Sequence, residues 1–152
     1  MKHLRTAALL LLSIFPTSGC SLLRPKPPLY TTVELEGGLL VQDLAVPDEG
    51  PRAEPGDVVT IHYTITRAAD GGVADSSLDR GQPFSFRLEP GAVFPGLARG
   101  LIGTRLLGRR RLFVPSAMGF GAEGAPEIPP HADLWVELEL MELERDSGQQ
   151  ER

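Results

Sequence analysis

Hydrophobic and polar residues alternate along several segments of this chain, a pattern typical of strands that bury one face. It is clearest in residues 58–67, where valine, isoleucine and tyrosine alternate with threonine and histidine. Residues 33–46 predict two further short strands, because Gly37 and Gly38 interrupt the apolar run. The remaining predicted strands are residues 83–88, 109–114 and 134–143.

One segment has the spacing of a helix. Phe94, Leu97 and Leu101 follow one another at intervals of three and four residues. Pro95 suits the first helical position, and Gly103 suits the end of the helix. Because a helix of about eight residues is not stable alone in water, it must pack against other elements. The sequence therefore predicts an α+β fold in which a sheet cradles one short helix.

Length, cysteine content and charge narrow the class of protein. The 152 residues are most simply one folded domain, expected at 33–144, followed by a polar tail at 145–152. The single cysteine excludes an internal disulfide and argues against a cysteine-based metal cluster. The formal net charge is −5, and it becomes −7 without the first 19 residues, which contain Lys2 and Arg5 but no acid. This charge argues against a nucleic-acid partner.

The first 20 residues have the pattern of a secretory signal, with a basic start, an apolar run and small residues before Cys20. The ending at 17–20 resembles the lipobox of bacterial lipoproteins, in which the cysteine becomes the lipidated first residue. Thr17 stands where that family usually has Leu, and an ordinary signal peptide with a leftover cysteine is the alternative. Ser21 resembles the residue of lipoproteins sorted to the outer membrane. We expect a lipoprotein signal peptide at 1–19 and a lipidated, proline-rich tether at 20–32.

Several short motifs occur in one order: His-Tyr-Thr at 62–64, Asp-Ser-Ser at 75–77, Pro-Phe-Ser-Phe at 83–86, Gly-Phe-Gly at 119–121 and Ile-Pro-Pro-His-Ala at 128–132. Together they resemble the FKBP-type prolyl isomerases, the immunophilins that bind macrolides such as rapamycin. The resemblance covers residues 33–144. It implies an antiparallel half-barrel sheet of about five strands wrapped around one short helix.

The resemblance also implies where the site lies. Asp75 would be the one carboxylate of an apolar pocket, with Tyr63 as its hydrogen-bond partner, and the Ile128 backbone N–H would hold a ligand carbonyl. No metal or other cofactor is implied. The pocket and substrate-binding residues implied by the family are Tyr63, Asp75, Phe84, Val93, Phe94, Leu97, Phe120, Ile128 and Val136.

Four positions depart from the family. Ala74, Leu97 and Val136 replace aromatic residues, and Phe120 replaces a tyrosine and so lacks its hydroxyl. Since each aromatic wall can bury roughly 150–250 Å², we expect a wider and less complementary pocket, with Phe94 refilling part of it. Weakened catalysis and weak macrolide binding are the expected consequences.

Other residues with reactive side chains are expected to be structural. His62 alternates outward on its strand, and His131 follows two prolines in a turn. The arginines at 109–111 should divide between the two faces of their strand, and one of them should pair with a glutamate of the last strand. Trp135 faces outward, and it is either covered by the segment around residues 29–30 or marks a partner surface.

The resemblance implies a peptidyl-prolyl cis–trans isomerase that assists the folding of exported proteins. Its partners would be proline-containing polypeptides, and its lipid would hold it at the outer membrane, facing the periplasm. Two alternatives stay open. The fold could serve as a non-catalytic chaperone or scaffold that binds peptides, or as a structural lipoprotein that uses the surface around Trp135.

Overall fold

The structure is a computed structural model that describes residues 31–145. The described chain forms one antiparallel sheet of seven strands and one α-helix. The helix, α1, is Pro95–Leu101, and two short 3₁₀ turns lie at Glu36–Gly38 and Ser116–Met118. The strands are β1 (Thr32–Leu35), β2 (Leu39–Ala45), β3 (Val58–Arg67), β4 (Val73–Ser76), β5 (Phe84–Arg87), β6 (Arg109–Val114) and β7 (Leu134–Glu144).

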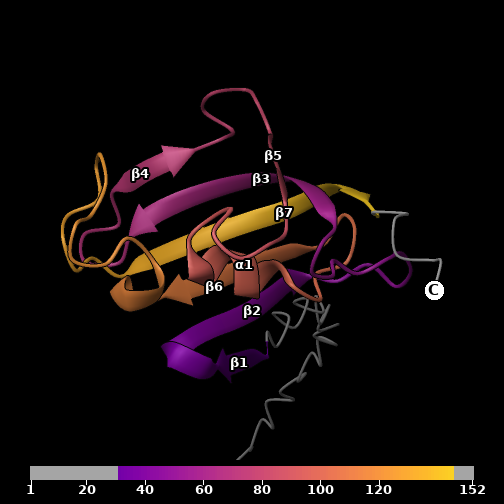
Figure 1. Ribbon diagram of the computed structural model, residues 1–152, viewed down its shortest axis with the longest axis horizontal. Coiled ribbons are helices and arrows are strands. Elements are labelled where there is room, and N and C mark those ends of the chain that lie inside the picture. Colours follow the sequence, from indigo (N-terminus) through magenta and orange to yellow (C-terminus); the bar gives the residue numbers. More distant parts are fainter. Residues whose placement is uncertain (1–30, 146–152) are drawn as a thin grey trace, which may run out of the picture.

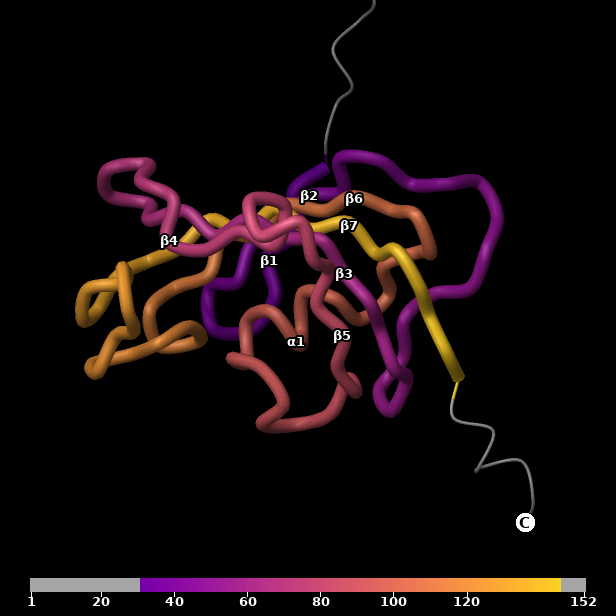
Figure 2. The backbone as a smooth tube through the Cα atoms, turned by 90° about the horizontal axis from the view of Figure 1, so that it is seen from above, coloured from indigo at the N-terminus to yellow at the C-terminus, as the bar shows by residue number. Residues whose placement is uncertain are grey.

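The strands lie in the order β1-β2-β6-β7-β3-β4, and β5 pairs with β3 beside this path. The helix packs on one face of the sheet, in front of the strands in Figure 1 and beneath them in Figure 2. Alternation decides which side chains meet it: residues 59, 61, 63 and 65 of β3 are buried, while those between them are only partly buried. In β7, residues 134, 136, 138 and 140 are buried, and those between them are partly buried or exposed. The core therefore lies between the sheet and α1.

This architecture confirms the predicted sheet around one short helix, with two differences in detail. The sheet has seven strands, whereas the family resemblance implied about five and the hydrophobic pattern predicted six. The two strands expected in residues 33–46 are present as β1 and β2, and β4 was not foreseen. Strand β1 begins at Thr32, one residue inside the segment expected to be tether, a shift within the ordinary uncertainty of strand ends. The signal peptide, Cys20 and nearly all of the tether lie outside the described residues.

Two glycines set the distance between α1 and the sheet. A Cβ atom on Gly96 would lie 2.4 Å from a methyl carbon of Val114, and one on Gly100 would lie 2.3 Å from a methyl carbon of Leu112. Both partners are on β6, so the helix backbone rests directly against the side chains of this strand. Leu97 and Leu101 of the same helix are buried. The helix ends at Leu101, and Gly103 follows with a φ of +79°, close to the predicted end.

Arg110 fastens the end of α1 to the sheet. Its side chain is buried, and it donates hydrogen bonds to the carbonyls of Gly100 (2.8 Å) and Ile102 (3.1 Å) and to Asp43 Oδ1 (2.7 Å). A cation at the carbonyl end of a helix also complements the helix dipole. The predicted division of the three arginines between two faces is confirmed, and this one provides a structural contact.

The long segment 116–133 has no strand and no α-helix, and its one regular element is the 3₁₀ turn at its start. Among residues 31–145, no helix is long and apolar enough to cross a membrane. The same part of the chain has no group of three or more His, Cys, Asp or Glu residues that could hold a metal ion.

Candidate functional site

Three side chains form a hydrogen-bonded cluster beside the middle of β3, where β4 pairs with it. We call this cluster the polar edge: Tyr63, Asp75 and Arg80. The Tyr63 hydroxyl donates to Asp75 Oδ2 at 2.5 Å, and Arg80 Nη2 donates to the Tyr63 oxygen at 2.9 Å. Arg80 also forms an ion pair with Asp75, and its guanidinium carbon lies 5.6 Å from the centre of the tyrosine ring. Each member thus contacts the other two, and the hydrogen bond between Tyr63 and Asp75 that the family resemblance implied is present.

The polar edge shifts two ionisations. Burial is the largest influence on Asp75 and favours its neutral form, but the hydrogen bonds from Tyr63 and Arg80 and the positive charge of Arg80 outweigh it. The pKa of Asp75 is therefore lowered, and the carboxylate is ionised at neutral pH. Burial, followed by the hydrogen bond to Asp75, raises the pKa of Tyr63 above 10.0. At neutral pH the cluster is an uncharged phenol between a carboxylate and a guanidinium.

A buried serine fixes the backbone on which Tyr63 stands. Ser77 Oγ accepts the Tyr63 N–H at 2.8 Å and lies 3.2 Å from the Tyr63 carbonyl oxygen. The same hydroxyl lies 3.0 Å from His62 Nδ1, which gives His62 a structural partner. Ser77 belongs to the Asp-Ser-Ser motif at 75–77, but the sequence assigned it no role, because residue type alone does not show that its hydroxyl bonds to the backbone of β3.

Aromatic rings continue the site from the polar edge along β5. The Phe84 ring meets the Tyr63 ring edge to face at 6.1 Å, and it stacks on the Phe86 ring at 5.1 Å. Phe84 is 37% exposed, so its ring is available to a ligand. Phe86 was not among the predicted site residues, although the alternation in 83–88 had placed it on the same face.

Three aliphatic side chains form what we call the apolar floor: Leu97 of α1, Ile128 of the long loop and Val136 of β7. All three are buried in one hydrophobic cluster that also includes Tyr63. Partly buried residues that pack against this cluster complete the set: Ala74, Val93, Phe94 and Phe120. Except for the exposed Phe84, the predicted apolar residues thus lie in or against the core that the sheet, the helix and the loop share, and this core includes Tyr63 of the polar edge.

Phe94 and Phe120 contact each other, with ring centres 5.0 Å apart and planes tilted by 48°. Phe94 thus lies against the ring at position 120, and its expected refilling of space in the pocket stays a prediction. The Ile128 N–H differs from its implied role, because it already donates to the Ala125 carbonyl at 2.9 Å. A ligand carbonyl would have to share or displace that bond.

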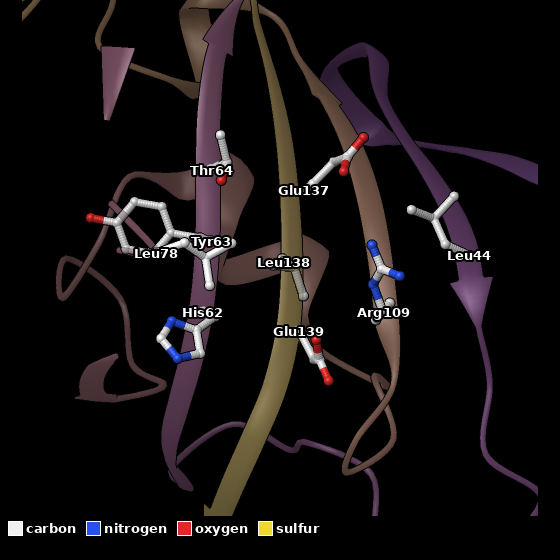
Figure 3. Close-up of a pocket in the computed structure, with 9 residues that line it drawn as sticks. All are labelled: Leu44, His62, Tyr63, Thr64, Leu78, Arg109, Glu137, Leu138 and Glu139. Carbon is white, nitrogen blue, oxygen red and sulfur yellow. The ribbon is translucent and has the colours of Figure 1, made fainter. Parts of the chain in front are cut away.

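The outer face of the sheet carries a different set of side chains. Figure 3 shows His62, Glu139 and Arg109 in one row across β3, β7 and β6, where Glu139 pairs in register with both neighbours. The hollow beside them has a volume of about 80 Å³, far smaller than an ordinary ligand pocket. It lies on the opposite face from α1, and we assign it no part in the candidate site.

The remaining predicted residues lie as follows. His131 is exposed in a turn with a φ of 58°, and its N–H donates to the Gly121 carbonyl. Arg111 forms the predicted pair with a glutamate of the last strand, with its Nε 3.7 Å from Glu137 Oε1. Trp135 is half-buried between the Phe113 ring at 5.0 Å and the Arg111 guanidinium at 4.3 Å. Residues 29–30, the other expected cover for Trp135, lie outside the described chain.

Comparison with known proteins gives consistent results. Residues 50–141 match the model of the FKBP-type peptidyl-prolyl cis-trans isomerase family. The chain is 44% identical over 108 residues to the FK506-binding protein of Neisseria meningitidis serogroup B, covering 70% of this chain and 97% of that protein. It is 40% identical over 107 residues to the peptidyl-prolyl cis-trans isomerase FKBP15-3 of Arabidopsis thaliana, covering 70% of this chain and 74% of the relative.

Among solved structures, FkpA from Escherichia coli matches with a TM-score of 0.68 and 32% identity. The match covers 74% of this chain and 51% of that one. The fold, the polar edge and the sequence matches agree with one another, and the chain belongs to the FKBP-type peptidyl-prolyl cis-trans isomerase family.

Proposed function

We propose that this protein isomerises Xaa-Pro bonds in exported polypeptides while they fold, with lower activity than family members that keep their pocket aromatics. The observation that carries the proposal is the polar edge of Tyr63, Asp75 and Arg80 beside a continuous apolar cluster. In that arrangement a proline ring can lie against apolar side chains while the polar groups stay at the rim.

The reaction needs no covalent chemistry. Amide resonance gives the peptide bond a rotational barrier of roughly 18–20 kcal/mol, and the Xaa-Pro bond exchanges over tens of seconds or longer without help. Rotation separates the nitrogen lone pair from the carbonyl and reduces charge separation, so apolar surroundings favour the twisted amide over both planar forms. A site that binds the twisted amide more tightly than either planar form accelerates exchange in both directions.

The residues have separate tasks in this scheme. Leu97, Ile128 and Val136 provide the apolar surroundings, and the exposed Phe84 ring provides a wall. Hydrogen bonds with Asp75 and Arg80 hold the Tyr63 side chain in place. Because the Phe84 ring packs against the Tyr63 ring, this also keeps the Phe84 wall in position when substrate binds. Reduced activity follows from the aliphatic residues at 97 and 136, from Ala74, and from Phe120, which cannot donate a hydroxyl hydrogen bond.

The N-terminal sequence supports a cellular location for this activity. Lipidation of Cys20 and a tether up to residue 32 would hold the domain close to the outer membrane, on its periplasmic side. Replacing the cysteine (Cys20→Ala) should move the protein from the membrane fraction to the soluble fraction. Retention of this variant in the membrane would contradict the lipid anchor.

The experiment for the activity is NMR exchange between the cis and trans forms of a short Phe-Pro peptide. The chain from Ser21 onward contains the whole described sheet and helix and is suitable as the enzyme, with and without rapamycin. Acceleration that is lost in Tyr63→Ala and Asp75→Ala supports the proposal. Peptide binding with unchanged exchange would instead favour a non-catalytic chaperone or scaffold, the reading that the four altered pocket positions support.

A further inference from the structure

A groove of about 390 Å³ lies between α1 and the segment that leads into it. This segment connects β5 to the helix and curves away from the strands in Figure 2. Three prolines line the groove, Pro55, Pro90 and Pro95, together with aliphatic parts of the loop and the helix. None of these residues belongs to the polar edge or the apolar floor.

The lining chemistry suits an aliphatic side chain. Prolines have no backbone N–H and a fixed φ, so these parts of the groove cannot pair with the backbone of an added strand and are stiff. Ala98 and Ile102 contribute methyl groups, and Ile102 is 43% exposed although it is aliphatic. Within residues 31–145, the charged side chains that line the groove are Glu89 and Arg99, one of each sign, so this lining gives no net preference for a charged ligand.

The groove adjoins the candidate site. Val93 lines the groove and also packs against the hydrophobic cluster that contains the apolar floor. The next residue is Phe94, whose ring contacts Phe120. Val93 is thus shared by the groove and by the set of predicted pocket residues. An extended chain advances about 3.3 Å per residue, so a substrate that contacts the predicted pocket at Val93 places a residue a few positions along its chain at the groove.

We propose that this groove binds an aliphatic side chain of the substrate polypeptide, a few residues away from the proline that is isomerised. The proposal rests on the proposed function and deepens it. It makes the preferred substrate an unfolded segment with leucine, isoleucine or valine near its proline. A short peptide cannot use this contact, so part of the affinity should depend on the length and composition of the substrate.

The test compares two 14-residue peptides with the same central Phe-Pro, one flanked by leucines and the other by serines. With the chain from Ser21 onward, kcat/KM for NMR-detected exchange should be about fivefold higher for the leucine peptide, since partial burial of a leucine is worth that much. The variant Ile102→Glu should remove this preference and leave kcat/KM for the serine peptide within about twofold. Ile102→Ala, a milder change, should reduce the preference.

The matched control is Val46→Glu, at another aliphatic residue, 52% exposed and outside the groove, which should keep the full preference. A preference that survives Ile102→Glu, or that Val46→Glu also removes, overturns the inference. If the unmodified chain accelerates neither peptide, the proposed isomerase activity fails, and NMR titration then decides on the groove. Methyl shifts of Ala98 and Ile102 with the leucine peptide alone support it, and unchanged methyl signals overturn it.

Discussion

The polar edge and the apolar floor lie next to each other but are held in different ways. Tyr63, Asp75 and Arg80 are joined by directional hydrogen bonds, and loss of one partner leaves the others with unmet bonds. Leu97 and Val136 are held by packing alone, where exchange among apolar residues of similar volume costs little. Two of the four departures from the family, Leu97 and Val136, fall in the apolar floor, and none of the four is a member of the polar edge. This difference teaches that the width of the pocket can change while the contacts among Tyr63, Asp75 and Arg80 stay intact.

The largest expected effect comes from making a cavity in the floor. Leu97 is almost completely buried, so Leu97→Ala should lower the free energy of unfolding by about 3 kcal/mol. Urea denaturation followed by circular dichroism measures this change. The control Leu97→Met keeps the volume and should cost less than about 1.5 kcal/mol. A loss below about 1 kcal/mol for the alanine variant would mean that packing at this residue does not hold the floor.

A smaller effect is expected when one hydroxyl leaves the polar edge. Tyr63→Phe keeps the ring but removes the bonds to Asp75 and Arg80, and it should cost about 1 kcal/mol of stability and reduce kcat/KM about fivefold. Thr66→Val is the control, because it removes a hydroxyl from the outer face of the same strand. Equal effects of the two substitutions on kcat/KM would show that the polar edge has no special part in the activity.

Restoring an aromatic residue to the pocket wall should raise the activity toward that of family members that keep their pocket aromatics. Ala74 is partly buried against the hydrophobic cluster, and Ala74→Phe should raise kcat/KM by roughly two- to tenfold, the worth of one aromatic contact. Val73→Phe places the same ring at the neighbouring, exposed position of β4 and should leave kcat/KM unchanged. No rise in a well-folded Ala74→Phe variant would refute the account of reduced activity.

The smallest expected effect is the pH dependence of the polar edge. The lowered pKa of Asp75 adds stability that is present above its ordinary value of 3.8 and is lost as the pH falls through the folded value. The raised pKa of Tyr63 acts at the other end: its contribution is present below 10.0 and is lost as the pH rises through the folded value. Because the Asp75 side chain is 39% exposed, solvent reduces its share to below about 1 kcal/mol.

Urea denaturation of the unmodified chain and of Asp75→Asn over a range of pH measures this contribution. The stability difference between the two should be constant at neutral pH and shrink below about pH 4. A difference that grows as the pH falls would reverse the assigned direction of the Asp75 shift.

The parts of the fold that could be predicted from the sequence are the strands in which apolar and polar residues alternate over many positions. Strands β3 and β7 could be predicted because ten or eleven residues alternate between two clearly different faces. Strand β4 could not, since four residues with a central Ala-Asp give no distinct period and depend on pairing with β3. Arg110 shows the same limit: its alternation could be foreseen, but its bonds to α1 and Asp43 depend on elements distant in sequence.

The site could be predicted mainly through the family resemblance. The resemblance indicated which residues belong to the site, but for most of them it did not indicate which groups they contact. The link between Tyr63 and Asp75 was expected on that basis. The role of Ser77 and the internal bond of the Ile128 N–H were not foreseen, because hydrogen bonds of the backbone leave little trace in residue type. The groove beside α1 was likewise not foreseen, since its lining combines Pro55 with residues from the distant segment 88–102.

The glycine contacts of α1 have a consequence for how this site can be altered. Gly96 and Gly100 set the spacing between helix and β6 through backbone contact, independently of the residue at position 97. A change of side chain at 97 therefore alters the depth of the floor while the helix keeps its place. The scaffold thus separates the part that positions the helix from the part that shapes the pocket, and binding specificity can be adjusted at a single site without rebuilding the fold.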